Sequence, residues 1–149
     1  MRKLVIDRAA IKNNLTVIKD RAAGAAIYGV VTGDGQGVGA AALAQLLRDE
    51  GIGRFAVSEI AEAEALRQAG FVDEEILMLR ATTDREELER LVDLNVVCTV
   101  SSVDTGMALN ALAGNRSTVA EAHIQVDTGM GFGGFLVSEP EKLLLAAEI

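Results

Sequence analysis

Residues 54–79 read RFAVSEIAEAEALRQAGFVDEEILML, a stretch that indicates a strand, a helix and a second strand. Arg54–Val57 and Glu75–Leu79 are short apolar runs without strict alternation, as in strands that are covered on both faces. Between them, Ser58 can cap a helix that Gly70 ends. A segment of this kind joins two parallel strands through a right-handed crossover.

The same alternation extends along the chain in both directions. Further strands are expected at residues 27–31, 96–100 and 120–126, and each is followed by a segment with helical periodicity. One of these helices starts at Asp84–Glu87, which has the spacing of a capping box. Another helix, near residues 7–22, precedes the first strand. The pattern predicts an α/β fold with about five parallel units, and leaves open a doubly wound sheet or part of an eightfold barrel.

Composition excludes several classes of protein. The 149 residues carry 22 acidic and 14 basic side chains, a formal charge of −8, and one domain over residues 1–149 is expected. The acidic balance and the 3% aromatic content argue against nucleic-acid binding. No apolar run is long enough for a membrane span, and Met1–Asp7 is too briefly apolar for a signal peptide. The single cysteine, Cys98, fits a reducing compartment, so a soluble cytoplasmic protein is expected.

A glycine-rich loop, TGDGQGVG at residues 32–39, follows the first expected strand. Loops after parallel strands open at the carboxyl edge of the sheet, where such folds bind ligands. Glycine also lets backbone N–H groups approach a phosphate at a helix N-terminus. Gly35, Gly37 and Ala40 satisfy a relaxed dinucleotide fingerprint, with Glu59 as a ribose-binding acid after the second strand. A plain strand-to-helix connection is the alternative interpretation.

A second glycine-rich loop, within residues 126–135, follows the fifth expected strand, so both loops share one edge of the sheet. Its VDTGM also occurs at residues 103–107. Two Asp-Thr-Gly copies suggest an aspartic protease, but the alternating strands and helices argue against that all-β architecture. His123, the only histidine, is expected to be buried and hydrogen-bonded rather than catalytic. No His and Cys residues have the spacing of a metal site.

These loops and the segments around them resemble the N-terminal, PLP-binding barrel domain of the alanine racemase family. The likeness runs nearly end to end, with several motifs in the family's order. Its segments are VIDRAAIKNNL (5–15), FAVS (55–58), EAEALRQAG (62–70), ILML (76–79), CTV (98–100) and VDTGMG (126–131). The resemblance implies a partial (β/α)8 TIM-type barrel of about five units after an N-terminal helix. The last barrel units and a C-terminal β domain would be absent.

The resemblance also implies a loss of chemistry. The family's first strand ends in VVKANAYGHG, whose lysine carries pyridoxal phosphate (PLP) as a Schiff base, whereas the stretch here reads VVTGDGQGVG. Thr32 stands at the lysine position, Gln36 at that of a phosphate-contacting tyrosine, and Gly37 is retained. Gln125 and Phe132 replace a frequent lysine and an arginine that pairs with the cofactor's phenolic oxygen. A threonine hydroxyl can neither form an imine nor act as the amine base.

We therefore expect a catalytically inactive module, a pseudoenzyme or a fragment of one, without a covalently held cofactor. Three alternatives remain open: binding of PLP or another phosphorylated ligand without a Schiff base, a residual racemase role within a longer protein, and a dinucleotide-binding doubly wound sheet. Residues 143–149 end in an apolar helical segment, which suggests truncation from a longer chain. Because an incomplete barrel exposes sheet edges, self-association or binding to the rest of a barrel is expected.

Overall fold

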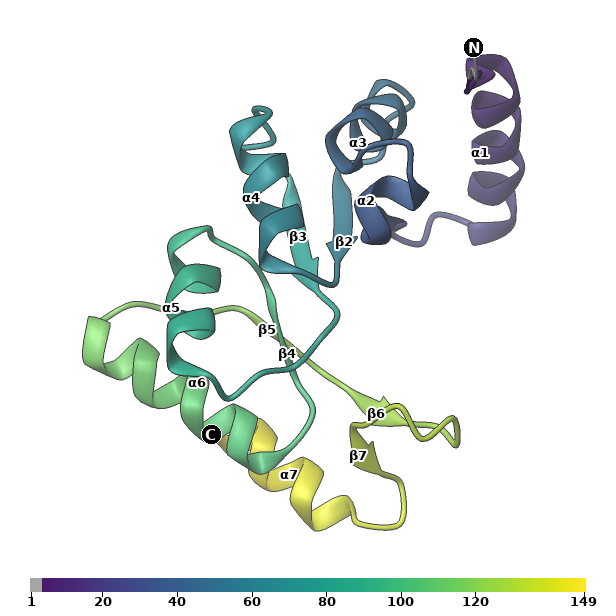
Figure 1. The fold of residues 1–149 in the computed structure, drawn as a ribbon. Helices are drawn as coiled ribbons and strands as arrows, with labels where there is room; N and C mark the ends of the chain where they lie inside the picture. Colours follow the sequence, from purple (N-terminus) through teal and green to yellow (C-terminus); the bar gives the residue numbers. More distant parts are fainter. Residues whose placement is uncertain (1–3) are drawn as a thin grey trace.

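The computed structural model describes residues 4–149, and its elements follow the predicted order of a helix and then alternating strands and helices (Figure 1). Met1–Lys3, part of the predicted domain and of the segment judged too short for a signal peptide, lie outside the described residues. The helices are α1 (Arg8–Ala22), α2 (Thr32–Gln36), α3 (Ala40–Asp49), α4 (Ile60–Gln68), α5 (Arg85–Asp93), α6 (Val103–Arg116) and α7 (Pro140–Glu148). The strands are β1 (Gly29–Val30), β2 (Arg54–Val57), β3 (Glu75–Met78), β4 (Cys98–Val100), β5 (Ala122–Ile124), β6 (Val126–Asp127) and β7 (Phe135–Leu136). None of the helices in residues 4–149 has the length and apolar character needed to span a membrane.

The strands pair in the order in which they occur along the chain. β1, β2 and β3 form one parallel sheet, in which Phe55 lies between Gly29 and Ile76. A parallel bridge between Leu77 and Val97 connects β3 to the segment before β4, and β4 pairs in parallel with β5. A doubly wound sheet would need a reversal of strand order, which the strands of residues 4–149 do not show. The doubly wound sheet is therefore wrong, and the order is that of part of a barrel.

The main hydrophobic core lies between the sheet and its helices. Phe55 and Val57 of β2 and Ile76 and Met78 of β3 point to this side and are buried, as is Leu66 of α4. These positions alternate along each strand, as expected for one face of a sheet. The helix-covered face therefore holds the first three strand–helix units together.

The opposite, inner face of the sheet is only partly covered. Ala56, Leu77 and Val97 form a small separate cluster there, with Tyr28 packed against it. Val30 of β1 is exposed, and so are all three residues of β5. The prediction that the strands are covered on both faces is therefore wrong for β1 and β5, because the arc of strands does not close.

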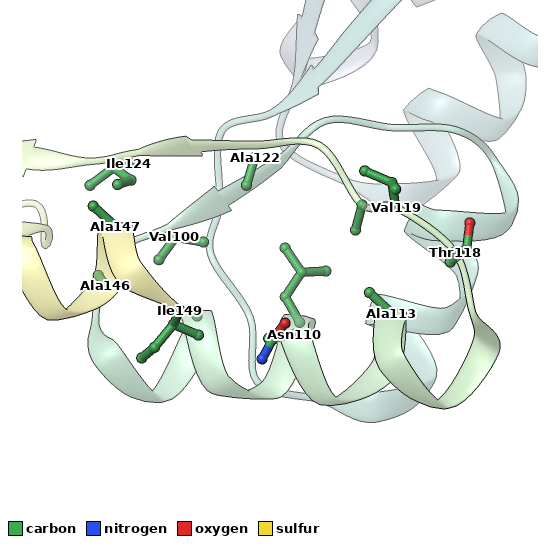
Figure 2. A pocket seen from close by; sticks show the side chains of 13 residues that line it. Val100, Asn110, Ala113, Thr118, Val119, Ala122, Ile124, Ala146, Ala147 and Ile149 are labelled. Atoms are coloured by element: carbon green, nitrogen blue, oxygen red, sulfur yellow. The ribbon is translucent and has the colours of Figure 1, made fainter.

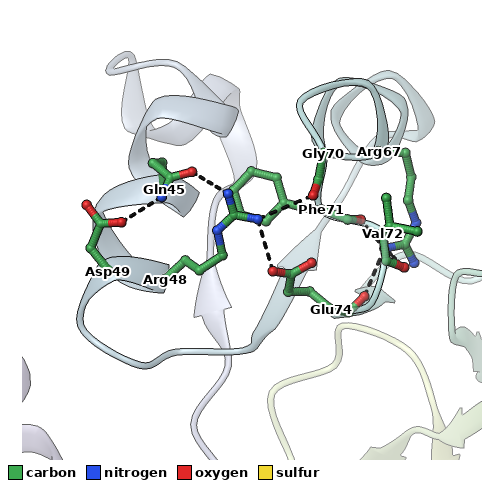
Figure 3. A network of polar contacts seen from close by, with 8 residues as sticks. All are labelled: Gln45, Arg48, Asp49, Arg67, Gly70, Phe71, Val72 and Glu74. Atoms are coloured by element: carbon green, nitrogen blue, oxygen red, sulfur yellow. Dashed lines mark hydrogen bonds and ion pairs between the residues drawn. The ribbon is translucent and has the colours of Figure 1, made fainter.

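Two arginines tie together the loops at the amino ends of the strands (Figure 3). The Arg67 guanidinium donates to the carbonyl oxygens of Phe71 and Glu74 before β3, and to two carbonyl oxygens before β4, at 2.6–2.8 Å. Burial lowers the pKa of Arg67, and the charge of Glu74 opposes that effect. Arg48 lies 4.1 Å from the centre of the Phe71 ring and 3.1 Å from Glu74. These contacts fix the loops between successive units.

Two helix starts differ from the prediction for identifiable reasons. α4 is capped at Glu59 rather than Ser58, because the Glu62 carboxylate accepts the Glu59 N–H at 3.1 Å. At α5, Asp84 accepts the Glu87 N–H at 2.9 Å, as predicted. The second hydrogen bond of a capping box does not form there, because the Asp84 N–H donates to Thr82 Oγ1 at 3.1 Å and the Glu87 carboxylate pairs with Arg80 at 2.9 Å.

Candidate functional site

Both glycine-rich loops lie at the carboxyl ends of parallel strands. The first loop, residues 32–39, leads from β1 to α3 and contains α2. The second loop, residues 128–134, leads from β6 to β7 (Figure 1). The paired strands from β1 to β5 are parallel and β6 directly follows β5, so both loops open at the carboxyl edge of the sheet. This edge is the candidate site, and we call it the rim.

The first loop begins with a left-handed turn that the sequence analysis did not anticipate. From Gly33 to Gly35, φ lies between 51° and 62° and ψ between 40° and 48°, and Gln36 has a φ of 60°. A left-handed helical conformation costs an ordinary L-residue about 1–2 kcal/mol, which glycine avoids. Gly35 has a second reason to be glycine, because a Cβ atom there would lie 3.0 Å from the Ala40 nitrogen. The turn itself therefore favours glycine at these positions, most strongly at Gly35.

Most donors of the first loop are already used within the chain. Gly35, Gly37 and Gly39 each donate their N–H to a carbonyl oxygen in the loop or just before it, at 2.8–3.1 Å. Ala40, the first residue of α3, donates to Asp34 Oδ1 at 3.1 Å. The N–H groups that the sequence analysis considered for a phosphate thus stabilise the loop.

The carboxylate of Glu62 links the carboxyl ends of β1 and β2. It accepts the N–H groups of Ser58 and Glu59 at 3.0 and 3.1 Å, and that of Asp34 in the first loop at 3.2 Å. Partial burial alone would raise the pKa of Glu62, but these backbone hydrogen bonds lower it below the ordinary value. The group is therefore a stable anion at the rim. Sequence reasoning missed Glu62, although its place three residues after Glu59 at a helix start was the available signal.

Asp127 organises the second loop. Its Oδ1 accepts the N–H of Gly129 at 2.8 Å and that of Gly131 at 3.1 Å, and these hydrogen bonds lower the pKa of Asp127. Gly134 is the last residue of the loop and lies close to the Gln125 backbone. A Cβ atom at this position would lie 2.8 Å from the Gln125 carbonyl oxygen, so the position needs glycine. The carboxylate thus holds the turn at the start of the second loop.

The five predicted site residues fall into two groups on the rim. Thr32 is half-buried at the start of α2, and Gln36 and Gly37 are exposed in the same loop. Gln125 is half-buried between β5 and β6, and Phe132 in the second loop is 80% exposed. Within residues 4–149, no backbone hydrogen bond connects the two loops. The structure therefore places three of these residues on one loop and two on or beside the other.

Two residues with possible nucleophilic or base chemistry lie outside both loops. Cys98 is buried in β4, and burial raises the pKa of its thiol to about 11, so the reactive thiolate is scarce near neutral pH. His123 of β5 is exposed, contrary to the expected buried histidine, because the inner face of the arc is open at β5. Its ring meets that of Tyr28 edge-on.

Comparison with known proteins finds relatives over most of the chain. Residues 6–148 match the family model described as alanine racemase, N-terminal domain. The alanine racemase of Clostridium tetani is 36% identical over 137 residues, which are 92% of this chain and 34% of that protein. An alanine racemase from Bartonella henselae with covalently bound pyridoxal phosphate superposes with a TM-score of 0.83 at 27% identity, covering 93% of this chain and 38% of that one.

A histidine racemase from Leuconostoc mesenteroides subsp. sake is similar to the same extent. Its structure superposes with a TM-score of 0.83 at 25% identity, over 95% of this chain and 37% of that one. The chain thus spans about a third of the length of the curated relatives it matches, such as the one from Clostridium tetani.

Proposed function

This chain belongs to the family of alanine racemase N-terminal domains, and we propose that it is a segment of the family's barrel without the covalent cofactor anchor. PLP is the family's cofactor, and when bound it supplies an electron sink for chemistry at an amino acid's α-carbon. The observation that carries the proposal is Thr32, which the family resemblance aligns with the Schiff-base lysine. An alcohol lacks the nitrogen from which an imine is made.

The lysines of residues 4–149 support this proposal, because none replaces the missing amine. Lys12 and Lys19 lie on α1, away from the first and second loops in the chain. Lys142 lies on α7, 2.8 Å from Glu139, and that hydrogen bond raises the pKa of Lys142. A lysine that forms imines at neutral pH instead needs a lowered pKa. The residues present therefore do not fit covalently bound PLP.

The rim also weighs against binding of PLP or another phosphorylated ligand without a Schiff base. The Glu62 carboxylate already accepts N–H groups from both strand ends, and Asp34 is a second acidic residue in the first loop. A phosphate would compete with one carboxylate for donors and be repelled by both. A residual racemase role requires PLP binding, which a PLP titration tests, and titration with NAD and nucleotides tests binding of another phosphorylated ligand.

The test is PLP titration followed by borohydride reduction, peptide mass spectrometry and an alanine racemisation assay. We expect the wild-type chain to show no imine absorbance band and no racemisation, and Thr32→Lys to gain a reducible adduct at position 32. Asn13→Lys is the matched control, because it adds an amine on the exposed side of α1 and is expected to gain no band. Racemisation by the wild-type chain, or a stoichiometric adduct on it, would overturn the proposal.

We also propose that the open side of β5 receives the rest of a barrel. An apolar groove of about 470 Å³ lies between β5, α6 and the end of α7, with Val100, Leu109 and Ala146 in its lining and no charged side chain (Figure 2). Val119 beside it is 88% exposed, and β5 has a partner strand on one side only within residues 4–149. An apolar groove beside an unpaired strand edge suits a further strand–helix unit.

Co-purification tests this partner. We expect the chain to bind a fragment of the Clostridium tetani relative that covers the part beyond the matched region, and Ile124→Lys to weaken that binding. Val17→Lys is the matched control, because Val17 on α1 is a similarly exposed apolar residue outside the groove. Binding that Ile124→Lys leaves unchanged, or a stable dimer of the chain alone that Ile124→Lys dissociates, would contradict the proposal.

A further inference from the structure

Tyr28 and His123 meet across the inner face of the arc of strands. Their ring centres lie 6.2 Å apart with an angle of 79° between the planes, an edge-on arrangement that aromatic rings favour. Tyr28 immediately precedes β1, whereas His123 lies in the middle of β5. In a flat sheet, four strand spacings of about 4.8 Å would separate β1 from β5 by about 19 Å. The two rings therefore meet only because the sheet is curled, which brings the residue before β1 close to β5.

Tyr28 is held firmly at its end of this contact. Its hydroxyl donates to the Glu75 carboxylate on β3, which Arg54 Nε on β2 contacts at 3.0 Å. The Arg54 guanidinium carbon lies 5.9 Å from the centre of the Tyr28 ring. The ring also packs against the inner apolar cluster that includes Leu77. Tyr28 is thus fixed relative to the first three strands, so its ring limits how closely His123 and β5 can approach β1.

The ladder of paired strands is interrupted between the two contact partners. β1, β2 and β3 form one continuous sheet, and β4 and β5 form another. Between the strands themselves, the two are connected by one bridge, Leu77–Val97, with backbone hydrogen bonds of 2.8 and 2.9 Å, and by the Thr99 hydroxyl, which donates to the Met78 carbonyl oxygen at 2.6 Å. Arg67 joins the loops that precede β3 and β4, at the amino ends of the strands and not at the rim. Pairing of neighbouring strands sets their spacing but leaves the curl of an open sheet free to vary. The contact between Tyr28 and His123 limits how far the curl of the sheet can vary.

The pair lies at a similar depth below both glycine-rich loops. Thr32, which begins the first loop, follows Tyr28 by four residues, and Thr128, which begins the second, follows His123 by five residues. At about 3.3 Å per residue, the two loops begin about 13 and 17 Å above the contact. We propose that the Tyr28–His123 pair is a spacer that sets the distance between the first and second loops of the rim. A ligand or partner segment that touches both loops must fit that distance.

Pulsed electron–electron distance measurements test the spacer. Nitroxide labels on Gln36→Cys and Met130→Cys report the separation of the loops, since both residues are exposed, and Cys98 is buried. His123→Ala is expected to shift the mean distance by several ångströms and to broaden its distribution. His123→Phe keeps a ring at the contact and is expected to restore the wild-type distribution.

Ile124→Ala is the matched control, because Ile124 belongs to the same strand but lines the groove on the helix side. It is expected to leave the distance unchanged. Tyr28→Phe removes only the hydroxyl that donates to Glu75 and is expected to broaden the distribution less than His123→Ala. Circular dichroism identifies any variant that fails to fold, and Tyr28→Phe then carries the test.

Two results would overturn the spacer. One is a folded His123→Ala variant whose mean distance and width match the wild type. The other is equal broadening by His123→Ala and Ile124→Ala, which would show general loosening of β5. Neither result depends on PLP, so the outcome is independent of the proposal about Thr32.

Discussion

β2 and β5 are both short parallel strands with apolar residues, yet they differ in how much of their surface is buried. Three of the four residues of β2 are buried, whereas all three of β5 are exposed. β2 has a partner strand on each side and helices over one face, whereas β5 pairs only with β4 within residues 4–149. Apolar sequence makes burial favourable at about 25 cal/mol per Å², but neighbours must supply the surface that excludes water. The comparison thus separates a closed side of the molecule, around β2, from an open side, around β5.

Truncating one apolar residue on each side is the strongest test of this difference. Phe55 of β2 is fully buried and meets the Phe71 ring at 5.3 Å between centres. Phe55→Ala is expected to lower the free energy of unfolding by about 3–5 kcal/mol through lost burial and the cavity left behind. Ile124→Ala on β5 is expected to cost less than about 1 kcal/mol, since the side chain is 40% exposed. Urea unfolding measures both, and equal losses would contradict the division into two sides.

The arginines give a second contrast. Arg67→Ala leaves four carbonyl oxygens, most of them partly buried, without their donor and is expected to cost about 2–3 kcal/mol. Arg67→Lys is expected to recover only part of this loss, because an ammonium cannot reach them all. Arg116 of α6 instead makes an ion pair with Asp93 near the surface at 2.6 Å. Arg116→Ala is expected to cost about 0–1 kcal/mol. Urea unfolding midpoints of the two variants measure this difference. A larger loss of stability for Arg116→Ala than for Arg67→Ala would contradict it.

The two loops provide the third contrast. Gly35→Ala is expected to cost about 2 kcal/mol, because it adds a left-handed alanine and a Cβ close to Ala40. Gly131→Ala places alanine at a φ of 72° with open space around it, so about 1 kcal/mol is expected. Calorimetric melting of both variants measures the difference. Equal costs would mean that the first loop yields to the added methyl group.

The smallest expected effect is on the stability of the folded chain at low pH. The hydrogen bond from Arg80 lowers the pKa of Glu87 to about 2. Because this folded-state pKa lies below the unfolded value, the stabilisation is fully present above about pH 4.5 and is lost as pH falls towards 2. Glu87→Gln is expected to flatten the pH dependence of stability in that window. Asp127→Asn on the open side is expected to change it less, and a larger change for Asp127→Asn would reverse the interpretation.

Sequence reasoning identified the units of the closed side well. It placed β2 correctly and β3 within one residue, and it put the start of α5 at Asp84. The expected strand at residues 27–31 forms only as Gly29–Val30, and that at residues 120–126 is split into β5 and β6. These end strands are short because each lacks a second partner to extend the ladder of hydrogen bonds within the described residues.

The rim was predicted in place but not in detail. Glycine spacing indicated a loop after β1, yet it did not reveal the left-handed turn at residues 33–36 or the carboxylate that ties it to β2. Glu62 and Asp34 are 28 residues apart in the chain, and only folding brings them within 3.2 Å. His123 likewise was expected to be buried from its apolar neighbours, but its surroundings depend on β1, a strand four pairings away.

The amino-acid sequence by itself determined the alternation of strands and helices, the two glycine-rich loops and the absence of an amine at position 32, because these follow from local side-chain pattern. Only the tertiary structure decided that the strands pair in chain order, that the loop donors serve the chain's own carbonyl and carboxylate oxygens, and that Tyr28 meets His123. These outcomes depend on distances between residues far apart in the chain, which the curl of the sheet sets and no local pattern encodes.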